Sequence, residues 1–530
     1  MSVLRDDAFH VYDTTLRDGA QREGMSLSVN DKLSIARHLD DLGVGFIEGG
    51  WPGANPKDTE FFKRAQTELK LGTAQLTAFG STRRAGGDVV SDLAPLRESG
   101  AGIVCMVAKA DVRHVERALR TTREENLAMI RDSVTHLRAE GQRVFLDAEH
   151  FFDGYLTDPA YAIEVLRTAA EAGADVVVLC DTNGGMLPHR LAEVVHEVVG
   201  TGLRVGIHAH NDAACAVANS LAAVHAGATH VQGTANGYGE RCGNADLFSI
   251  VAALEAKDGR EVLPPGRLVE LGRVAHAVAE VANIAPDPHQ PWVGASAFAH
   301  KAGLHVSAIK ADPDLYQHAD PAVVGNDMRL LVSELAGRAT IELKGRALGL
   351  EPDRDTVARV VERVKDLESI GYSFEAAEAS FELLLREEMG ERPHYFDLES
   401  YRVIVEHRSG KDGAEGEVVS EATVKLHAKG ERIVATGEGN GPVNALDNAL
   451  RQALETLYPS LASLELVDYK VRIVSGAHGT DAVTRVLVET SDGTREWDTV
   501  GVHENVIAAS WQALEEAYTT GLMHEGVDSS

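Results

Sequence analysis

Short apolar stretches alternate with longer amphipathic segments through the first 250 residues of the chain. The apolar stretches are rich in β-branched residues and predict eight strands, at residues 9–13, 45–48, 74–78, 102–107, 144–148, 176–181, 205–210 and 230–234. The segments between them have the apolar spacing of helices. Residues 30–42 are an example, with a capping asparagine at Asn30 and the leucines mostly on one face.

Eight strand–helix units in about 250 residues favour a closed (β/α)8 TIM barrel, an α/β domain over residues 1–285. An open doubly wound sheet is the alternative that the pattern leaves. Polar residues stand at or just after the predicted strand ends, among them Glu48, Glu149 and Thr182. The carboxyl ends of all barrel strands open on one rim, where this fold carries catalytic residues. The pattern therefore predicts an active site at that rim.

The chain changes character after the predicted barrel. Prolines and histidines interrupt the helical pattern over residues 286–320, which predicts loops. Residues 330–390 predict helices, most clearly at 331–350 and 355–370. After Pro393 strands are predicted at 401–406, 421–427 and 432–436 before a helix at 445–457, and again at 469–474, 483–489 and 497–500 before a helix at 504–518.

This recurrence predicts two βββα units. The sequence Gln-Ala-Leu-Glu at 452–455 returns at 512–515, and Gly441 has a counterpart at the same offset in Gly501. We therefore expect a mostly helical connector over residues 286–392 and a pseudo-symmetric C-terminal α+β domain over residues 393–522.

The composition narrows the class of protein. The chain has 530 residues, of which 44% are hydrophobic and 25% charged, enough for two or three domains with sizeable cores. Its formal charge of −30 opposes binding to nucleic acid or to an anionic membrane. We see no apolar run near the roughly 20 residues of a membrane span and no secretory signal. Four cysteines without a Cys-x-x-Cys pair predict reduced thiols and a cytoplasmic location.

Two histidines mark a candidate metal site. His208 and His210 stand at the end of a predicted strand, where residues two apart face the same side. Two imidazoles aimed into a barrel mouth can bind a divalent metal; the alternative is a hydrogen-bonded pair of core histidines. Asp18 follows the first strand and Asn244 the eighth, which adjoin the seventh strand when a barrel closes. Such a mixed site suits Mg²⁺, Mn²⁺ or Zn²⁺.

Arg17 precedes Asp18 and can lie beside the metal. A guanidinium next to a metal-bound carbonyl oxygen stabilises negative charge that develops there. The alternative is a surface arginine paired with a carboxylate, and Glu48 is a candidate partner in either case. The glycine-rich segment 236–244 lacks the context of a dinucleotide fingerprint, so its glycines are interpreted as turns over the barrel mouth.

Three ordered motifs carry a family resemblance. DTTLRDGAQ at 13–21, HAHND at 208–212 and GERCGN at 239–244 resemble the signatures of the isopropylmalate, homocitrate and citramalate synthases. The resemblance covers nearly the whole chain. Within that family, WPGANPKD at 51–58, CAVANS at 215–220 and YQHADP at 316–321 look most like the citramalate branch.

The resemblance implies a Claisen-type condensation of acetyl-CoA with a 2-oxo acid, followed by hydrolysis of the thioester. In the citramalate branch the 2-oxo acid is pyruvate, and the product leads to isoleucine. By motif, the metal is held by Asp18, His208, His210 and Asn244. Arg17 with Glu48 and Thr182 is assigned to the substrate, with Thr182 gripping its carboxylate.

The resemblance also implies catalytic roles for Glu149, His305 and Tyr316. In this family the segment that carries His305 and Tyr316 reaches the partner subunit's active site, which implies a homodimer. Whether Glu149 or His305 removes the methyl proton stays open. Glu149 could instead form a salt bridge at the rim, with the neighbouring His150 as the functional residue, and Tyr316 could simply pack a loop.

A glycine run in the C-terminal domain resembles the effector-binding turn of leucine-regulated relatives. Gly437, Gly439 and Gly441 precede a helix that is predicted to begin near Val443, and a helix N-terminus favours a carboxylate. The implied effector is isoleucine, as an inhibitor. The alternative is a dimerisation domain whose glycines only make tight turns.

Three other functions stay open at this stage. The first is another synthase of the same family, such as isopropylmalate or homocitrate synthase. The second is a lyase on a similar barrel, against which the long C-terminal domain argues. The third is a catalytically silent amino-acid sensor, which the intact Arg17, Asp18, His208 and His210 disfavour.

Overall fold

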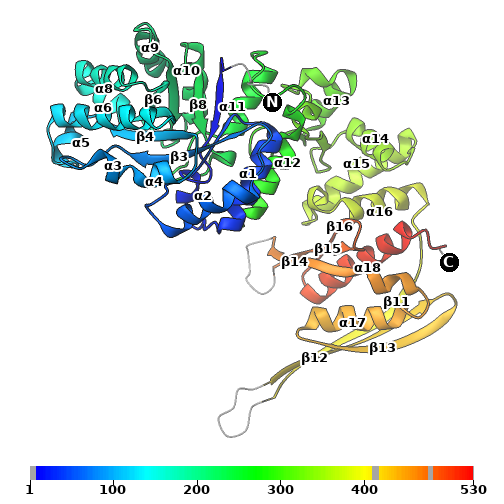
Figure 1. The fold of residues 1–530 in the computed structure, drawn as a ribbon. Coiled ribbons are helices and arrows are strands. Elements are labelled where there is room, and N and C mark those ends of the chain that lie inside the picture. Colours follow the sequence, from blue (N-terminus) through cyan, green and yellow to red (C-terminus); the bar gives the residue numbers. More distant parts are fainter. Residues whose placement is uncertain (1–6, 409–416, 475–481, 529–530) are drawn as a thin grey trace. The chain divides into compact units, whose positions relative to one another are not determined.

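The computed structural model of the chain describes residues 7–408, 417–474 and 482–528 (Figure 1). Contacts divide it into two compact units. The first unit comprises Met1–Phe298 and Ala319–Asp327, and the second comprises Ala299–His318 and Met328–Ser530.

Eight parallel strands form a closed barrel in the first unit (Figure 1). They are β1 (His10–Asp13), β2 (Phe46–Gly50), β3 (Gln75–Ser81), β4 (Ile103–Lys109), β5 (Arg143–Glu149), β6 (Val176–Asp181), β7 (Val205–Ala209) and β8 (His230–Gly233). Each strand pairs with the next in the sequence, and β8 pairs with β1, with His10 opposite His230. The predicted TIM barrel is confirmed, and the open doubly wound sheet is wrong.

The connections between the strands are helices, as predicted. They are α1 (Val29–Leu42), α2 (Pro56–Glu68), α3 (Val89–Asp92), α4 (Ala94–Glu98), α5 (Val112–Arg117), α6 (Arg123–Ala139), α7 (Phe151–Thr157), α8 (Pro159–Glu171), α9 (Pro188–Val199), α10 (Ala216–His225), α11 (Leu247–Ala256) and α12 (Leu271–Val281). The predicted cap of α1 is wrong: the helix is capped by Ser28, not Asn30. Ser28 Oγ accepts from Asp31 N (3.2 Å) and Asp31 Oδ2 accepts from Ser28 N (2.7 Å), a reciprocal capping box.

The barrel interior changes from aromatic to polar along its axis. Tyr12, Phe46 and Phe145 pack inside the strands, with the rings of Phe46 and Phe145 edge to face at 5.4 Å. Polar side chains lie further along the same strands, towards their carboxyl ends, including the buried Glu48 and Asp147. Because side chains alternate along a strand, residues two apart share the interior, and this places the polar layer under the rim.

The second unit begins with a small helical region. A short parallel pair joins β9 (Ala299–His300) to β10 (Arg329–Leu330), and the helices are α13 (Gly303–Ala311), α14 (Arg338–Ala347), α15 (Arg354–Ser369) and α16 (Glu378–Met389). Two sequence predictions need correction. Residues 303–311 form a helix where loops were predicted, and residues 331–337 are not helical. Ser333 holds a turn there, since its Oγ accepts from Leu335 N (3.2 Å) and its carbonyl accepts from Ala336 N (2.8 Å).

The C-terminal part contains the two predicted βββα units. The first is β11 (Asp397–Arg408), β12 (Glu417–Ala428), β13 (Glu431–Gly439) and α17 (Pro442–Leu454), and the second is β14 (Glu465–Ile473), β15 (Thr484–Ser491), β16 (Glu496–His503) and α18 (Val506–His524). Each set of three strands forms an antiparallel sheet that packs on its own helix. The predicted α+β architecture is confirmed.

Close approach of each sheet to its helix explains the glycines of this domain. A Cβ on Gly437 would lie 2.4 Å from Ala449 N, and one on Gly439 would lie 2.5 Å from Ala445 N. In the second βββα unit, a Cβ on Gly501 would lie 1.9 Å from Ala509 O. Gly501 therefore corresponds in packing to Gly437, whereas Gly441 caps α17 with open space around its Cβ position. The pairing of Gly441 with Gly501 by sequence offset is wrong at the level of packing.

Candidate active site

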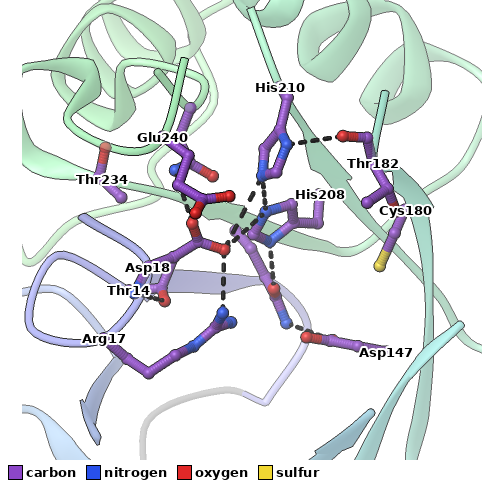
Figure 2. Close-up of polar contacts among 12 residues, drawn as sticks. Thr14, Arg17, Asp18, Asp147, Cys180, Thr182, His208, His210, Thr234 and Glu240 are labelled. Atoms are coloured by element: carbon purple, nitrogen blue, oxygen red, sulfur yellow. Dashed lines mark hydrogen bonds and ion pairs between the residues drawn. The ribbon is translucent and has the colours of Figure 1, made fainter. Parts of the chain in front are cut away.

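Loops after β1 and β8 and the end of β7 bring the predicted metal ligands together at the barrel rim. Asp18, His208 and His210 are all buried, and one ligand atom of each lies within 4.8 Å of the others. His208 Nε2 is 3.5 Å and His210 Nε2 is 3.8 Å from Asp18 Oδ2, and the two Nε2 atoms are 3.2 Å apart (Figure 2). The strand alternation that predicted a common face for the two histidines thus places both beside Asp18.

The opposite edge of each imidazole is also bonded. His208 Nδ1 lies 2.7 Å from Gln232 Oε1, and His210 Nδ1 lies 2.8 Å from the Thr182 carbonyl oxygen (Figure 2). Arg241 Nη2 is also 2.9 Å from His210 Nδ1. Burial lowers the pKa of His208 to about 4, despite the opposing effect of Asp18, so this imidazole is neutral at neutral pH. A neutral His208 that donates from Nδ1 keeps an Nε2 lone pair directed at the group.

Asn244 completes the group. Its Nδ2 donates to Asp18 Oδ1 (3.1 Å) and to the Tyr238 carbonyl oxygen (3.0 Å). Its Oδ1 is buried and has no hydrogen-bond partner among the residues that the structure describes. A carboxylate, two imidazoles and a spare amide oxygen form the N/O donor set that divalent cations take in proteins. The side chains fit a divalent metal, and the ligand assignment itself stays a prediction.

Arg17 lies inside the rim. Its Nη1 donates to Asp18 Oδ2 (3.0 Å), its Nε donates to Glu48 Oε2 (3.0 Å), and its guanidinium stacks 3.8 Å above the Phe79 ring. Its side chain is only 14% exposed, so the surface arginine considered as the alternative is wrong in position. Although burial opposes the charge, Glu48 and Asp18 raise the pKa of Arg17 above its ordinary value. A permanent cation therefore stands beside the candidate metal site.

Two buried carboxylates, Asp18 and Glu48, flank Arg17. Burial would raise the pKa of Asp18, but Arg17 and the two histidines hold it well below its usual range. Glu48 is fully buried and accepts from Thr14 Oγ1 (2.7 Å) and Tyr12 Oη (3.2 Å). Glu48 thus anchors Arg17 from below, which is a positioning contact.

Thr182 and Glu149 stand on neighbouring strands at the rim. Thr182 Oγ1 accepts from His150 N (2.8 Å), which leaves the hydroxyl hydrogen for a ligand oxygen. His150 has a φ of +58°, an unusual value for a residue with a side chain, and it is this turn that aims its N–H at Thr182. Glu149 is 27% exposed and forms an ion pair with Lys109. The rim salt bridge considered for Glu149 is therefore present, and its catalytic role stays a prediction.

His305 and Tyr316 lie in the second unit. Their rings stack with centroids 4.2 Å apart, and Tyr316 is 41% exposed. The structure brings these two residues together with each other. Their predicted place in a catalytic site stays a prediction, as does the effector role of Gly437, Gly439 and Gly441.

Sequence patterns did not predict the residues beneath the histidines. Gln232 and Asp147 are buried in the barrel and link to His208, and Cys105 donates to Asp147 Oδ1 (3.2 Å). Strand alternation was the available signal, since Asp147 stands two residues before Glu149 on one strand. It could not show which interior side chains meet across the barrel.

Matches to known families cover the whole of this architecture. The HMGL-like family matches residues 8–278, the homocitrate synthase post-HMGL domain-like family matches residues 292–371, and the LeuA allosteric (dimerisation) domain matches residues 375–522. The barrel with its polar rim is therefore an HMGL-like barrel, followed by a post-HMGL region and a LeuA allosteric (dimerisation) domain.

Curated relatives narrow the class further. The chain is 67% identical to the (R)-citramalate synthase of Streptomyces coelicolor, over 98% of each chain. It is 50% identical to the (R)-citramalate synthase of Synechocystis, over 97% of this chain and 96% of the relative. It is 48% identical to that of Aquifex aeolicus, over 97% and 98%. The chain belongs to the citramalate synthase family, which confirms the resemblance drawn from its motifs.

The first prediction concerns the ligands. His208→Ala or Asp18→Ala should weaken binding of a divalent metal by more than about 100-fold, because even loss of an outer partner of a ligand typically costs 10- to 100-fold. The melting temperature of the metal-free protein should change little, since rim residues contribute little to the barrel core. Isothermal titration with Mn²⁺ and Zn²⁺ measures the first effect and calorimetric melting the second.

His225→Ala is the matched control for this test. His225 is on α10, its side chain is 56% exposed, and it pairs with Asp258 (2.7 Å) away from the rim. It should bind metal like the unchanged protein. Equal metal affinity in His208→Ala and His225→Ala would contradict the ligand assignment.

Proposed function

We propose that the protein catalyses the condensation of acetyl-CoA with pyruvate to give (R)-citramalate and CoA. The observation that carries the proposal is the near full-length similarity to three (R)-citramalate synthases in a chain whose barrel rim holds Arg17 against Asp18, His208 and His210. An acyltransferase of this kind forms a carbon–carbon bond between the acetyl methyl carbon and the pyruvate carbonyl carbon. Water then hydrolyses the thioester and releases CoA.

The proposed metal centre consists of Asp18, His208, His210 and Asn244. A divalent cation, Mg²⁺, Mn²⁺ or Zn²⁺, supplies a Lewis acid for the 2-oxo acid when it is bound there. Arg17 is held by Glu48 and Asp18 and is positioned to stabilise negative charge that develops on the reacting oxygen. Thr182 can donate its hydroxyl hydrogen to the pyruvate carboxylate. Local cations are needed, because both substrates are anions and the chain carries a formal charge of −30.

The proton of the acetyl methyl group goes to Glu149 or to His305. Glu149 is 27% exposed at the rim, where it pairs with Lys109, so its carboxylate is accessible to acetyl-CoA. His305 has a ring that stacks on Tyr316, and an imidazole is the side chain that most often serves as a general base. Either base needs simultaneous stabilisation of the enolate, since a thioester α-proton is weakly acidic.

The proposed enzyme is a homodimer in the cytoplasm. Apolar side chains around the His305 segment are exposed, with Leu304 at 75% and Leu315 at 61%, as expected for a segment that docks on a second chain. The sheets of the C-terminal domain also expose valines and isoleucines, among them Val405, Val418, Val434, Val471 and Ile473. All four cysteines are free, which is consistent with a reducing compartment. Among the described residues, no helix combines the length and apolar character needed to cross a membrane.

Isoleucine is the proposed inhibitor, acting through the C-terminal domain. The packing of β13 on α17 limits the effector assignment to the end of the glycine run. Gly437 and Gly439 are needed for close contact with the helix, so a side chain at Gly439 would disturb this packing. Gly441 caps α17 with open space around it and is the position at which a ligand carboxylate can approach the helix N-terminus.

The second prediction tests the substrate. In an assay of CoA thiol release, pyruvate should give the highest kcat/KM, with 2-oxobutanoate next and 2-oxoisovalerate far behind. Each methylene by which two substrates differ changes the ratio of their kcat/KM values by roughly 10- to 200-fold. A pocket sized for a methyl group excludes an isopropyl branch. Identification of the product completes the assay. A preference for 2-oxoisovalerate would assign the chain to isopropylmalate synthesis instead.

The third prediction concerns His305. His305→Ala should lower kcat by about 10²- to 10⁴-fold, the usual effect of losing a general acid or base, with metal affinity unchanged. Ser307→Ala, at an exposed position of the same helix, is the control. Mixing inactive His305→Ala chains with inactive Arg17→Ala chains should restore part of the activity if one site uses both chains. Unchanged turnover in His305→Ala leaves Glu149 as the base.

The fourth prediction concerns regulation. Gly441→Val should lower the melting temperature only slightly, because valine is a poorer N-cap than glycine, and should keep the turnover of pyruvate. It should reduce inhibition by isoleucine at least about tenfold, since a β-branched side chain blocks the N-terminus of α17. Gly439→Val should instead lower the melting temperature, because its side chain meets the α17 backbone. Turnover is measured against increasing isoleucine, with leucine in parallel. An unchanged protein that ignores both amino acids at millimolar concentration contradicts the regulatory proposal.

A further inference from the structure

Gln232 lies between His208 and a buried carboxylate on the far side of the barrel. Gln232 Oε1 is 2.7 Å from His208 Nδ1, and Gln232 Nε2 is 2.9 Å from Asp147 Oδ1 (Figure 2). The three side chains come from β7, β8 and β5, and each is at most 5% exposed. They form one continuous chain of hydrogen bonds from the barrel interior to the candidate metal site.

The carboxylate of Asp147 fixes the direction of these hydrogen bonds. An ionised Asp147 can only accept, so the Gln232 amide must turn its NH₂ group towards it and its oxygen towards His208. The other neighbours of that NH₂ group can accept as well: Cys105 Sγ lies at 3.8 Å, and His230 Nε2 lies at 3.3 Å and accepts when its own hydrogen is on Nδ1. His208 is then obliged to carry its hydrogen on Nδ1, which leaves the Nε2 lone pair facing Asp18 and His210.

If the hydrogen bonds ran in the opposite direction, His208 could not bind a metal. If the Gln232 amide turned round, it would donate to Nδ1, and the imidazole hydrogen would move to Nε2, the atom that points at Asp18 Oδ2 from 3.5 Å. An Nε2 that carries hydrogen cannot bind a cation. The direction of the chain therefore decides whether His208 is a ligand.

We propose that Asp147 and Gln232 are positioning residues that hold His208 in its metal-binding tautomer. Asp147 orients the Gln232 amide, and Gln232 in turn orients His208. This inference rests on the proposed metal centre. Neither residue touches the reacting atoms. Asp147 acts only by accepting from Gln232, with Cys105 Sγ donating to the same oxygen (3.2 Å).

The burial of a carboxylate here supports the proposal. Burial, and then the nearby Glu48, raise the pKa of Asp147 to about 7, against the opposing effect of Arg17. A barrel that needed only to be filled would carry an apolar side chain at this position, because burying a charge without need is unfavourable. The measurements belong at about pH 8, where Asp147 is ionised and can only accept.

Direct metal titration of the full-length protein tests the proposal, with Mn²⁺ and Zn²⁺ as probes. Gln232→Met has similar length and removes both hydrogen bonds; it should weaken metal binding about 10- to 100-fold. Asp147→Asn can accept or donate and no longer fixes the direction, so its affinity should lie between that of Gln232→Met and that of the unchanged protein. Thr77→Val is the control. Thr77 is fully buried in the barrel, and its hydroxyl has no partner within the described part of the chain.

The exchange variant Gln232→Glu with Asp147→Asn separates positioning from packing. The carboxylate at 232 accepts from His208 Nδ1, and the amide at 147 donates to it, so the direction is kept with the two groups exchanged. Metal affinity should return to within about threefold of the unchanged protein, whereas a mere packing defect would add up in the double variant. This variant also keeps the test open if Gln232→Met does not fold, as judged by melting.

Two results would overturn the proposal. The first is metal affinity in Gln232→Met or Asp147→Asn equal to that of Thr77→Val. The second is a folded exchange variant that binds metal no better than Asp147→Asn. If the unchanged protein itself binds no divalent metal, the proposed metal centre is wrong, rather than the positioning role of Asp147 and Gln232. The two failures are therefore distinguishable.

Discussion

Closure of the eight-stranded barrel is the constraint on which the site depends. Pairing of β8 with β1 places the loop that carries Arg17 and Asp18 beside the ends of β7 and β8. A direct hydrogen bond from Asn244 Nδ2 to Asp18 Oδ1 therefore joins residues from opposite ends of the barrel sequence. In an open sheet the first and last strands would be edges, and these side chains would lie apart.

Electrostatic balance within the rim makes this closure compatible with burial. Arg17 is shared between Glu48 and Asp18, so the buried guanidinium pairs with a carboxylate on each side. The balance is incomplete around the histidines, where nitrogen lone pairs, Asp18 and the spare oxygen of Asn244 converge. That local excess of acceptors is the electrostatic reason a divalent cation suits the site. The overall charge of the protein does not by itself create a specific metal site.

The second unit contributes a different kind of constraint. His305 and Tyr316 stack on each other in a segment with exposed leucines, which suits a contact made outside its own fold. In the C-terminal domain, by contrast, the glycines are explained from within, since β13 and β16 each approach a helix too closely for a side chain. Within the run of Gly437, Gly439 and Gly441, Gly441 alone has open space around its Cβ position, and this separates a candidate ligand position from the two packing glycines before it.

The sequence alone determined the element order, the barrel class and the residues at the rim. β-branched runs and helical periodicity are local properties, so eight strands were placed close to their observed bounds, and Asp18, His208 and His210 were recognised by their place at strand ends. The sequence prediction was wrong in two places, where side-chain hydrogen bonds of Ser28 and Ser333 set the local structure. The tertiary structure decided the rest. Whether Gln232 meets Asp147 and His208 depends on the stagger with which β5, β7 and β8 close, and whether Gly437 packs on a helix depends on how near α17 comes. Both are distances between segments far apart in the chain, which no periodicity within a segment records.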